Sequence, residues 1–138
     1  MAYENENFKR GRRVEGEQLA LNGLEKNHVT VRQIDPKTGR EGATIPDAFK
    51  NEGKSTTEIK NVNTQTLTRQ LRLQENFSTE RGFKPELLIN SGAQISKQLG
   101  NSAFVIKTYD NPAYKNLETS SLSNIPEQAQ INSELKPG

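Results

Sequence analysis

Apolar residues recur at helical spacing near the beginning of the chain and alternate with polar ones directly afterwards. Val14, Leu21 and Leu24 lie three or seven residues apart, which predicts an amphipathic helix over about residues 11–26. Gly23 weakens the end of this pattern and Asn27 is a suitable stop, so we expect the helix to end there. Residues 28–34 then alternate at period two, which is typical of a half-buried strand.

Beyond this strand the chain consists of short apolar segments separated by turns. The turn at residues 35–39 contains a proline, which restricts φ, and a glycine, which tolerates positive φ. Further strands are expected at residues 43–49, 55–62, 86–90 and 103–109, and further helices at residues 65–77, capped by Asn63 or Thr64, and at residues 93–99.

The order of these elements is helix, three-strand meander, helix, strand, short helix, strand. It predicts an α/β fold with a mixed β-sheet flanked by helices, in which the apolar strand 86–90 is central. We expect residues 1–8 to be a disordered N-terminus or linker, residues 9–109 to form a single domain, and residues 110–138 to form a polar C-terminal tail.

Composition narrows the functional classes only in part. Hydrophobic residues make up 30% of the chain and the mean hydropathy is −0.88, so part of the chain is not expected to pack. No apolar run is typical of a membrane segment or signal peptide. The absence of cysteine excludes disulfides and thiolate zinc sites, and a net charge of +2 permits binding to nucleic acid.

One carboxylate-x-lysine motif stands out because of its surroundings. The pattern occurs four times, but the matches at residues 35–37 and 52–54 lie in turns and the match at residues 134–136 lies in the polar tail. Only Glu58 and Lys60 flank an apolar residue inside a predicted strand. Period-two geometry places both on one face while Ile59 points into the core.

The neighbouring strand supplies a second carboxylate, Asp47, and a short hairpin loop lets it approach Glu58. Two converging carboxylates repel each other unless a cation lies between them, and oxygen ligands favour a hard ion such as Mg²⁺ or Mn²⁺. With Lys60 beside an attacked phosphate, this arrangement is typical of a metal-dependent nuclease. The alternative is an exposed sheet face that carries a Glu–Lys pair.

Two acids of the first helix, Glu15 and Glu17, are candidates for a third carboxylate. On a helical wheel Glu17 falls among Val14, Ala20 and Leu21, whereas Glu15 lies off this apolar arc. Because a carboxylate on a buried face must be paired or bound to metal, the wheel favours Glu17.

Basic residues gather in two places, Arg12 and Arg13 in the first predicted helix and Arg69 and Arg72 in the second. They could follow a phosphodiester backbone or form solvated helix faces.

Four motifs in order along residues 9–109 carry a family resemblance. They are Gly11-x-x-x-Glu15 (or Glu17), Ile45-Pro46-Asp47, Glu58-Ile59-Lys60-Asn61-Val62 and Thr68-Arg69-Gln70-Leu71-Arg72. The chain resembles the PD-(D/E)xK nuclease superfamily. More narrowly, it is similar to the restriction-endonuclease-fold toxin domains at the C-termini of bacterial polymorphic toxins, including contact-dependent inhibition and Rhs-type effectors.

The resemblance implies a role for each matching residue. Asp47 and Glu58 would be metal ligands, with the carbonyl of Ile59 as a further ligand, and Lys60 would orient or help deprotonate the attacking water. The acid of the first helix would hold a second metal or its water; the family pattern favours Glu15, the wheel favours Glu17, and both stay open. Gln70 would contact the scissile phosphate or Lys60.

The implied function is that of a Mg²⁺- or Mn²⁺-dependent endonuclease toxin used in interbacterial competition, cutting DNA with low sequence specificity. The alternatives are a tRNA-cleaving RNase toxin of the same fold and a non-enzymatic binding module. The resemblance also implies delivery as the C-terminal part of a larger secreted effector, action in the cytoplasm of the target bacterium, and a cognate immunity protein as partner.

Overall fold

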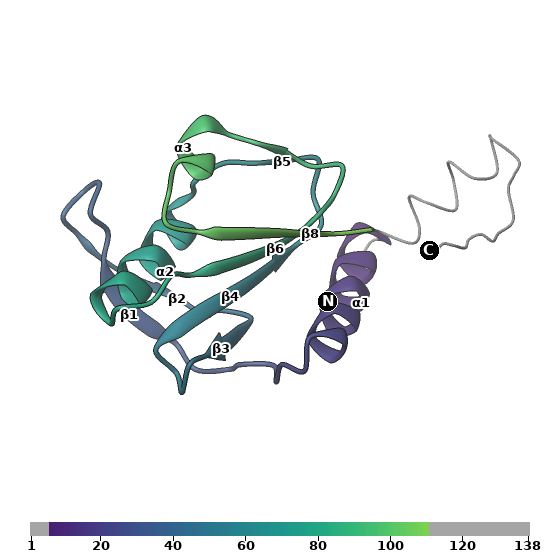
Figure 1. Ribbon diagram of the computed structural model, residues 1–138, viewed down its shortest axis with the longest axis horizontal. Coiled ribbons are helices and arrows are strands. Elements are labelled where there is room, and N and C mark those ends of the chain that lie inside the picture. The colour runs from purple at the N-terminus through teal and green to yellow at the C-terminus, as the bar shows by residue number, and fades with distance from the viewer. Residues whose placement is uncertain (1–5, 111–138) are drawn as a thin grey trace, which may run out of the picture.

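The computed structural model describes residues 6–110, with side chains from residue 10 onward, and contains three helices and eight strands in that range (Figure 1). They are α1 (Glu6–Leu21), β1 (Val31–Ile34), β2 (Glu41–Thr44), β3 (Ala48–Lys50), β4 (Ser55–Lys60), β5 (Thr64–Gln65), α2 (Arg69–Glu80), β6 (Glu86–Asn90), β7 (Gln94–Ile95), α3 (Lys97–Gly100) and β8 (Val105–Tyr109). Residues 6–8, expected to be disordered or a linker, form the first residues of α1. Residues 1–5 and the expected tail from residue 111 onward lie outside the described residues.

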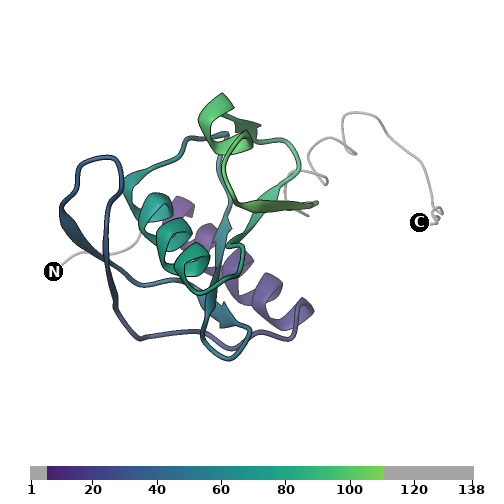
Figure 2. The same ribbon diagram turned by 60° about the vertical axis from the view of Figure 1, so that its left-hand side comes forward.

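The central sheet has the strand order β3-β4-β6-β8. β3 is antiparallel to β4, whereas β4, β6 and β8 are mutually parallel. The apolar strand β6 is therefore central, as predicted, and the predicted mixed α/β fold class is confirmed. The sheet separates α1 from α2, as the two views in Figures 1 and 2 show.

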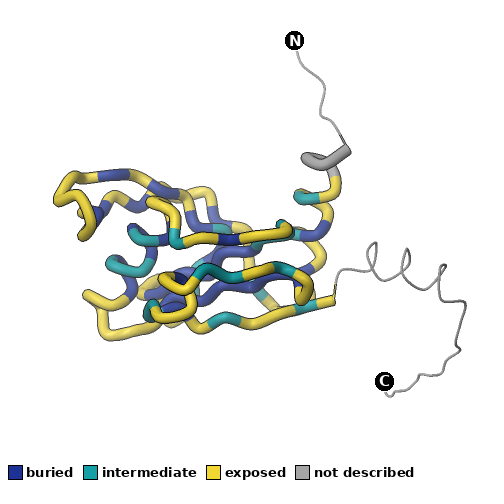
Figure 3. Tube along the Cα trace, turned by 90° about the horizontal axis from the view of Figure 1, so that it is seen from above, coloured by how far each residue is buried: buried dark blue, intermediate teal, exposed yellow. Residues whose placement is uncertain are grey.

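Each face of the sheet has its own apolar core. Towards α2, one cluster consists of Leu71, Leu87, Ile89, Leu99 and Phe104. Towards α1, the other consists of Leu19, Ala48, Ile59 and Leu88. Buried positions concentrate along the central strands in Figure 3, with exposed positions around them. Ile59 therefore points toward α1, and the alternation of the strand turns its two neighbours toward α2.

The prediction of one continuous strand over residues 43–49 was wrong, and with it the three-strand meander. Residues 45–47 separate β2 from β3; β2 pairs with β1 in a sheet of its own, while β3 pairs with β4. Pro46 has no N–H to donate to a ladder, and the N–H of Asp47 donates to the Glu58 side chain instead. Asp47 consequently lies directly before β3, outside the strand.

The first helix ends earlier and faces another way than predicted. It stops at Leu21, and Gly23 follows with a φ of +66° in the turn. Val14, Gln18 and Leu19 are buried, but Leu21 is 78% exposed. The apolar arc drawn through Leu21 was therefore rotated away from the face that packs on the sheet.

Other boundaries shift by a few residues. The segment around residue 64 pairs in parallel with β7, so α2 begins only at Arg69, and Thr68 is its N-cap in place of Asn63 or Thr64. The first strand shortens to 31–34, the last to 105–109, and the helix expected at 93–99 is confined to α3. The predicted turn at residues 35–39 is confirmed, since Gly39 has a φ of +76° and donates to the carbonyl of Asp35 at 2.7 Å.

The β1–β2 hairpin is attached to α2 through polar and close-packed contacts. The Arg72 guanidinium donates two hydrogen bonds, each 2.9 Å long, to the fully buried Asp35 carboxylate. Gly42 lies close to α2, since an added Cβ would come within 2.6 Å of Arg69 Nη2 and 2.9 Å of Leu73 Cδ1. These contacts hold the hairpin beside the segment that leads to Asp47.

No helix among residues 6–110 is long and apolar enough to cross a membrane.

Candidate active site

Two hydrogen bonds connect Asp47 with the Glu58-Ile59 segment of β4. The backbone N–H of Asp47 donates to Glu58 Oε1 at 3.3 Å, and the backbone N–H of Ile59 donates to Asp47 Oδ2 at 2.8 Å. The expected approach of the two carboxylates across the β3–β4 hairpin is thus observed. Backbone donors, and not side-chain rotamers alone, determine where the Asp47 carboxylate lies.

Asn27 holds the Pro46-Asp47 segment in place from the loop after α1. Its backbone N–H donates to the Asp47 carbonyl at 2.8 Å, and its buried side-chain amide donates to the Pro46 carbonyl at 2.9 Å. Sequence reasoning assigned Asn27 only a role as helix stop. No local signal links it to Asp47, because twenty residues separate the two.

Glu58 and Lys60 lie on the same face of β4, as predicted. Lys60 Nζ lies 3.6 Å from Glu58 Oε2, and only 6% of Glu58 is exposed. The backbone carbonyl of Lys60 accepts a hydrogen bond of 2.7 Å from the Tyr109 hydroxyl at the end of β8. The strand is therefore held at its carboxyl end, where the lysine begins to reach solvent.

Gln74 is a further site residue, which sequence reasoning missed in favour of Gln70. Gln74 is fully buried, and its Nε2 donates to Glu58 Oε1 at 3.0 Å and to Thr44 Oγ1 at 3.2 Å. A signal was present, since the polar Gln74 interrupts the stripe of Leu71 and Phe77 on the sheet-facing side of α2.

Gln70 lies one helical turn before Gln74 and is exposed. It lines a pocket of about 320 Å³ together with Thr30, Ala43, Thr44 and Ile45. The structure shows no hydrogen bond from Gln70 to Lys60, so its predicted contact with the substrate stays a prediction.

Asp47 is the most perturbed acid of the site. Burial and then the neighbouring charge of Glu58 raise the pKa of Asp47 to about 7. The Ile59 N–H lowers this pKa, and the Glu15 carboxylate raises it further. Two carboxylates, one buried and one partly buried, are held together here, which is unfavourable unless a cation lies between them.

The third acid of the site is Glu15. Its carboxylate accepts a hydrogen bond from Lys26, whose ammonium also lies 3.4 Å from Asp47 Oδ1. Burial lowers the pKa of Lys26, but the hydrogen bond that Lys26 donates to Glu15 and the charges of Asp47 and Glu15 raise this pKa on balance. The preference for Glu17 was wrong in geometry, because Glu17 is 48% exposed at its side chain and pairs with Arg13.

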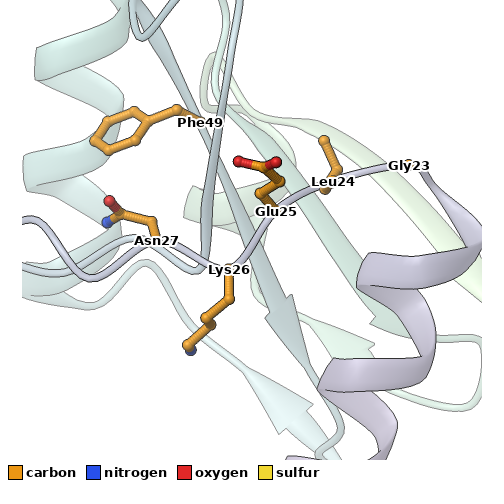
Figure 4. Close-up of a pocket in the computed structure, with 6 residues that line it drawn as sticks. All are labelled: Gly23, Leu24, Glu25, Lys26, Asn27 and Phe49. Carbon is orange, nitrogen blue, oxygen red and sulfur yellow. The ribbon is translucent and has the colours of Figure 1, made fainter.

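Glu15, Lys26, Asp47 and Glu58 form one corner of the domain. Two pockets adjoin this corner, and Lys26 lines both. One, of about 330 Å³, is formed by residues 23–27 and Phe49; Figure 4 shows the Lys26 side chain extending away from Phe49 and Glu25. The other, of about 290 Å³, is lined by Arg12, Glu15, Gly16, Leu19 and Lys26. Glu15 thus opens onto a pocket beside α1.

The basic candidates divide into two groups. Arg72 is committed to Asp35, so the structure gives it a structural role in place of the predicted contact with nucleic acid. Arg69 is exposed and donates to the Glu41 carbonyl at 3.3 Å, while Arg12 and Arg13 are exposed on α1. Contacts of Arg12, Arg13 and Arg69 with phosphate groups stay a prediction.

The donor set fits a hard divalent cation in its chemistry. Asp47 and Glu58 bring two carboxylates together, and oxygen ligands of this kind are those that Mg²⁺ and Mn²⁺ prefer. Across residues 10–110, no three histidine, cysteine, aspartate or glutamate side chains are grouped as a metal site. Glu15 is directed toward Lys26 instead of completing such a group.

Comparison with protein families decides the affiliation of the chain. Residues 13–99, well over half of the sequence, match the family described as restriction endonuclease fold toxin 7. The chain belongs to the restriction endonuclease fold toxin family. No match was found among curated proteins or among solved structures.

Membership of the restriction endonuclease fold toxin family confirms the predicted PD-(D/E)xK toxin domain. The family indicates a nuclease toxin that acts on nucleic acid and is delivered into target cells. The matched range includes Glu15, Asp47, Glu58, Lys60 and Gln74, so the whole corner described above lies inside the toxin domain.

Proposed function

We propose that this chain is a divalent-metal-dependent endonuclease toxin that hydrolyses DNA with low sequence specificity. The supporting observation is that Asp47 donates a hydrogen bond to Glu58 and accepts one from Ile59, with the ammonium of Lys60 on the same strand face as Glu58. In a structural Glu–Lys surface pair, no second carboxylate would be held against the first. Holding these two carboxylates together costs electrostatic free energy in the folded state. A bound cation would offset this cost, which favours a functional role for the pair.

Asp47 and Glu58 would hold Mg²⁺ or Mn²⁺, with the Ile59 carbonyl as a further ligand. When bound, such an ion polarises a phosphate oxygen, lowers the pKa of a water and offsets negative charge on the leaving oxygen.

The protein groups around this pair have separable tasks. Lys60 would orient the attacking water and stabilise the charge that develops on the phosphate. Gln74 would keep Glu58 in its orientation, because the amide donates to Glu58 Oε1 while it is anchored on Thr44. Glu15, from α1, would keep the Lys26 ammonium beside Asp47.

The substrate would be held by its backbone. Arg12, Arg13 and Arg69 are exposed cations on the helices that flank the sheet, and Gln70 lines a pocket beside the first turn of α2. Phosphate contacts of this kind position a nucleic acid without reading its sequence. Low sequence specificity follows, with interbacterial competition as the setting, action in the cytoplasm of the target bacterium, and an immunity protein as the partner that protects the producing cell.

The chain contains a matched control for the central experiment. Glu52 and Lys54 repeat the carboxylate-x-lysine pattern in the exposed β3–β4 turn, at the opposite end of the hairpin from Asp47. Plasmid DNA and total tRNA should be incubated with Mg²⁺ and the wild-type protein, Lys60→Ala or Lys54→Ala, with EDTA as a further arm.

We expect wild type and Lys54→Ala to degrade plasmid DNA equally, EDTA to abolish cleavage, and Lys60→Ala to reduce it by at least about 100-fold. Cleavage of tRNA alone would assign the RNase alternative. Degradation of neither substrate, or degradation that Lys60→Ala leaves intact, would overturn the proposal.

A further inference from the structure

Lys26 lies beside the candidate active site, although none of the sequence motifs that indicate a nuclease includes it. It comes from the loop after α1, and its ammonium contacts the carboxylates of both Glu15 and Asp47. These acids come from different elements, a helix and the start of an edge strand, and Lys26 is the cation between them. A divalent ion shared by the same two carboxylates would have to take this place.

The position of Lys26 is built into the loop on both sides. Before it, the N–H of Leu24 donates to the Leu19 carbonyl at 2.9 Å, and Leu24 packs against the core cluster beneath α1. After it, Asn27 makes the two hydrogen bonds to the Pro46-Asp47 segment described above. The backbone of Lys26 is thus tied both to the helix that carries Glu15 and to the strand entry that carries Asp47.

The charges of the corner match one divalent ion better than two. Asp47, Glu58 and Glu15 bring three negative charges, and Lys26 and Lys60 bring two positive charges. One divalent ion would leave a single positive charge facing the phosphate. A second ion beside Lys26 would add two more positive charges within a few ångströms of an existing ammonium, which is unfavourable because the like charges repel each other.

We propose that Lys26 takes the place of a second divalent ion, so that this nuclease binds one ion, at Asp47 and Glu58. The inference rests on the proposed function and deepens it. Lys26 is a positioning residue: it holds the outer oxygen of Asp47 and neutralises Glu15, while the inner oxygen of Asp47 is held by the Ile59 N–H.

The test is the stoichiometry of ion binding without nucleic acid. Isothermal titration calorimetry with Mn²⁺, and separately with Ca²⁺, should be carried out on wild type, Lys26→Met, Lys26→Arg and the exposed control Lys54→Met. Methionine keeps the length of the side chain and removes its charge, whereas arginine keeps the charge.

We expect one ion per chain for wild type, Lys26→Arg and Lys54→Met, and two for Lys26→Met. In EDTA, Lys26→Met should also unfold at a lower temperature than Lys54→Met, and saturating Mn²⁺ should raise its unfolding temperature by more than that of wild type. Two ions bound by wild type, or one ion bound by a folded Lys26→Met, would overturn the inference. The wild-type stoichiometry decides the matter even if Lys26→Met does not fold.

The plasmid assay separates this inference from the proposed function. Mg²⁺-dependent cleavage by a wild-type protein that binds two ions would overturn the role of Lys26 and leave the nuclease standing. Absence of both ion binding and cleavage would overturn the two proposals together.

Discussion

Two aspartates of this domain, the fully buried Asp35 and the partly buried Asp47, have opposite electrostatic environments. Asp35, in the β1–β2 hairpin, accepts two hydrogen bonds from Arg72 and one from the Lys37 N–H. The Arg72 guanidinium, against the effect of burial, holds the pKa of Asp35 down at about 2. Asp47 lies directly before β3, and burial together with the charge of Glu58 raises its pKa to about 7.

The difference between these environments helps to distinguish a structural carboxylate from a functional one. Asp35 pairs with the oppositely charged Arg72, so the ionised form of Asp35 stabilises the folded state. Asp47 is placed against carboxylates, with Lys26 in contact with only one of its oxygens. The environment of Asp35 is typical of a structural ion pair, whereas that of Asp47 is typical of a site that binds a cation.

The largest expected effect comes from removing the charge of Asp47. Asp47→Asn should reduce plasmid cleavage by at least about 100-fold, the size associated with losing one direct electrostatic contact to the reacting groups. Because the substitution relieves repulsion with Glu58, the metal-free variant should unfold at the wild-type temperature or above it. Cleavage assays and thermal unfolding in EDTA measure both. A strong loss of stability would show that Asp47 is structural, like Asp35.

The converse result is expected for Asp35. Asp35→Asn leaves the buried Arg72 guanidinium without its carboxylate, so the free energy of unfolding should fall by about 3 kcal/mol. The cleavage rate per folded molecule should stay within a few-fold of wild type. Urea unfolding gives the first quantity and cleavage in the native baseline the second. Arg13→Met, which removes the exposed pair with Glu17, is the control and should change stability by about 0.5 kcal/mol or less.

A smaller effect is expected where α2 supports the site. Gln74→Ala removes the amide that orients Glu58 and should lower kcat about 10-fold, with little change in KM. Gln70→Ala, on the exposed turn before it, should instead raise KM. Steady-state kinetics on a labelled DNA duplex separates the two. Equal behaviour of both variants would contradict the assignment of Gln74 to the site and Gln70 to the substrate.

The smallest effect is a pair of opposite pH dependences of stability in EDTA. The folded pKa of Asp35 lies below its ordinary value of 3.8, so its contribution is complete above about pH 4 and is lost as the pH falls toward 2. The folded pKa of Asp47 lies above 3.8, so its ionisation costs stability as the pH rises from about 4 to 7. Urea titrations across pH 2–8 should show Asp47→Asn flattening only the upper range and Asp35→Asn only the lower. Equal changes in both ranges would contradict the comparison.

The sequence alone was sufficient to predict that Asp47 lies beside Glu58 and that Lys60 shares the strand face of Glu58. Alternation along a strand is a covalent property of the extended backbone, so Glu58 and Lys60 share a face whatever surrounds them. The short loop between two strands brings Asp47 beside Glu58 for a similarly local reason. The central place of β6 followed from its continuous apolar run.

Only the tertiary structure decided which other groups meet this pair. Glu15 and not Glu17 faces the site because the buried side of α1 runs through Gln18 and leaves Leu21 in solvent, a rotation that depends on what the helix packs against. Lys26 and Gln74 reach the site from segments 21 and 16 residues away from their carboxylate partners Asp47 and Glu58. A periodic pattern determines which side chains share a face of one element, but the contacts between elements are set by packing, which no single segment encodes.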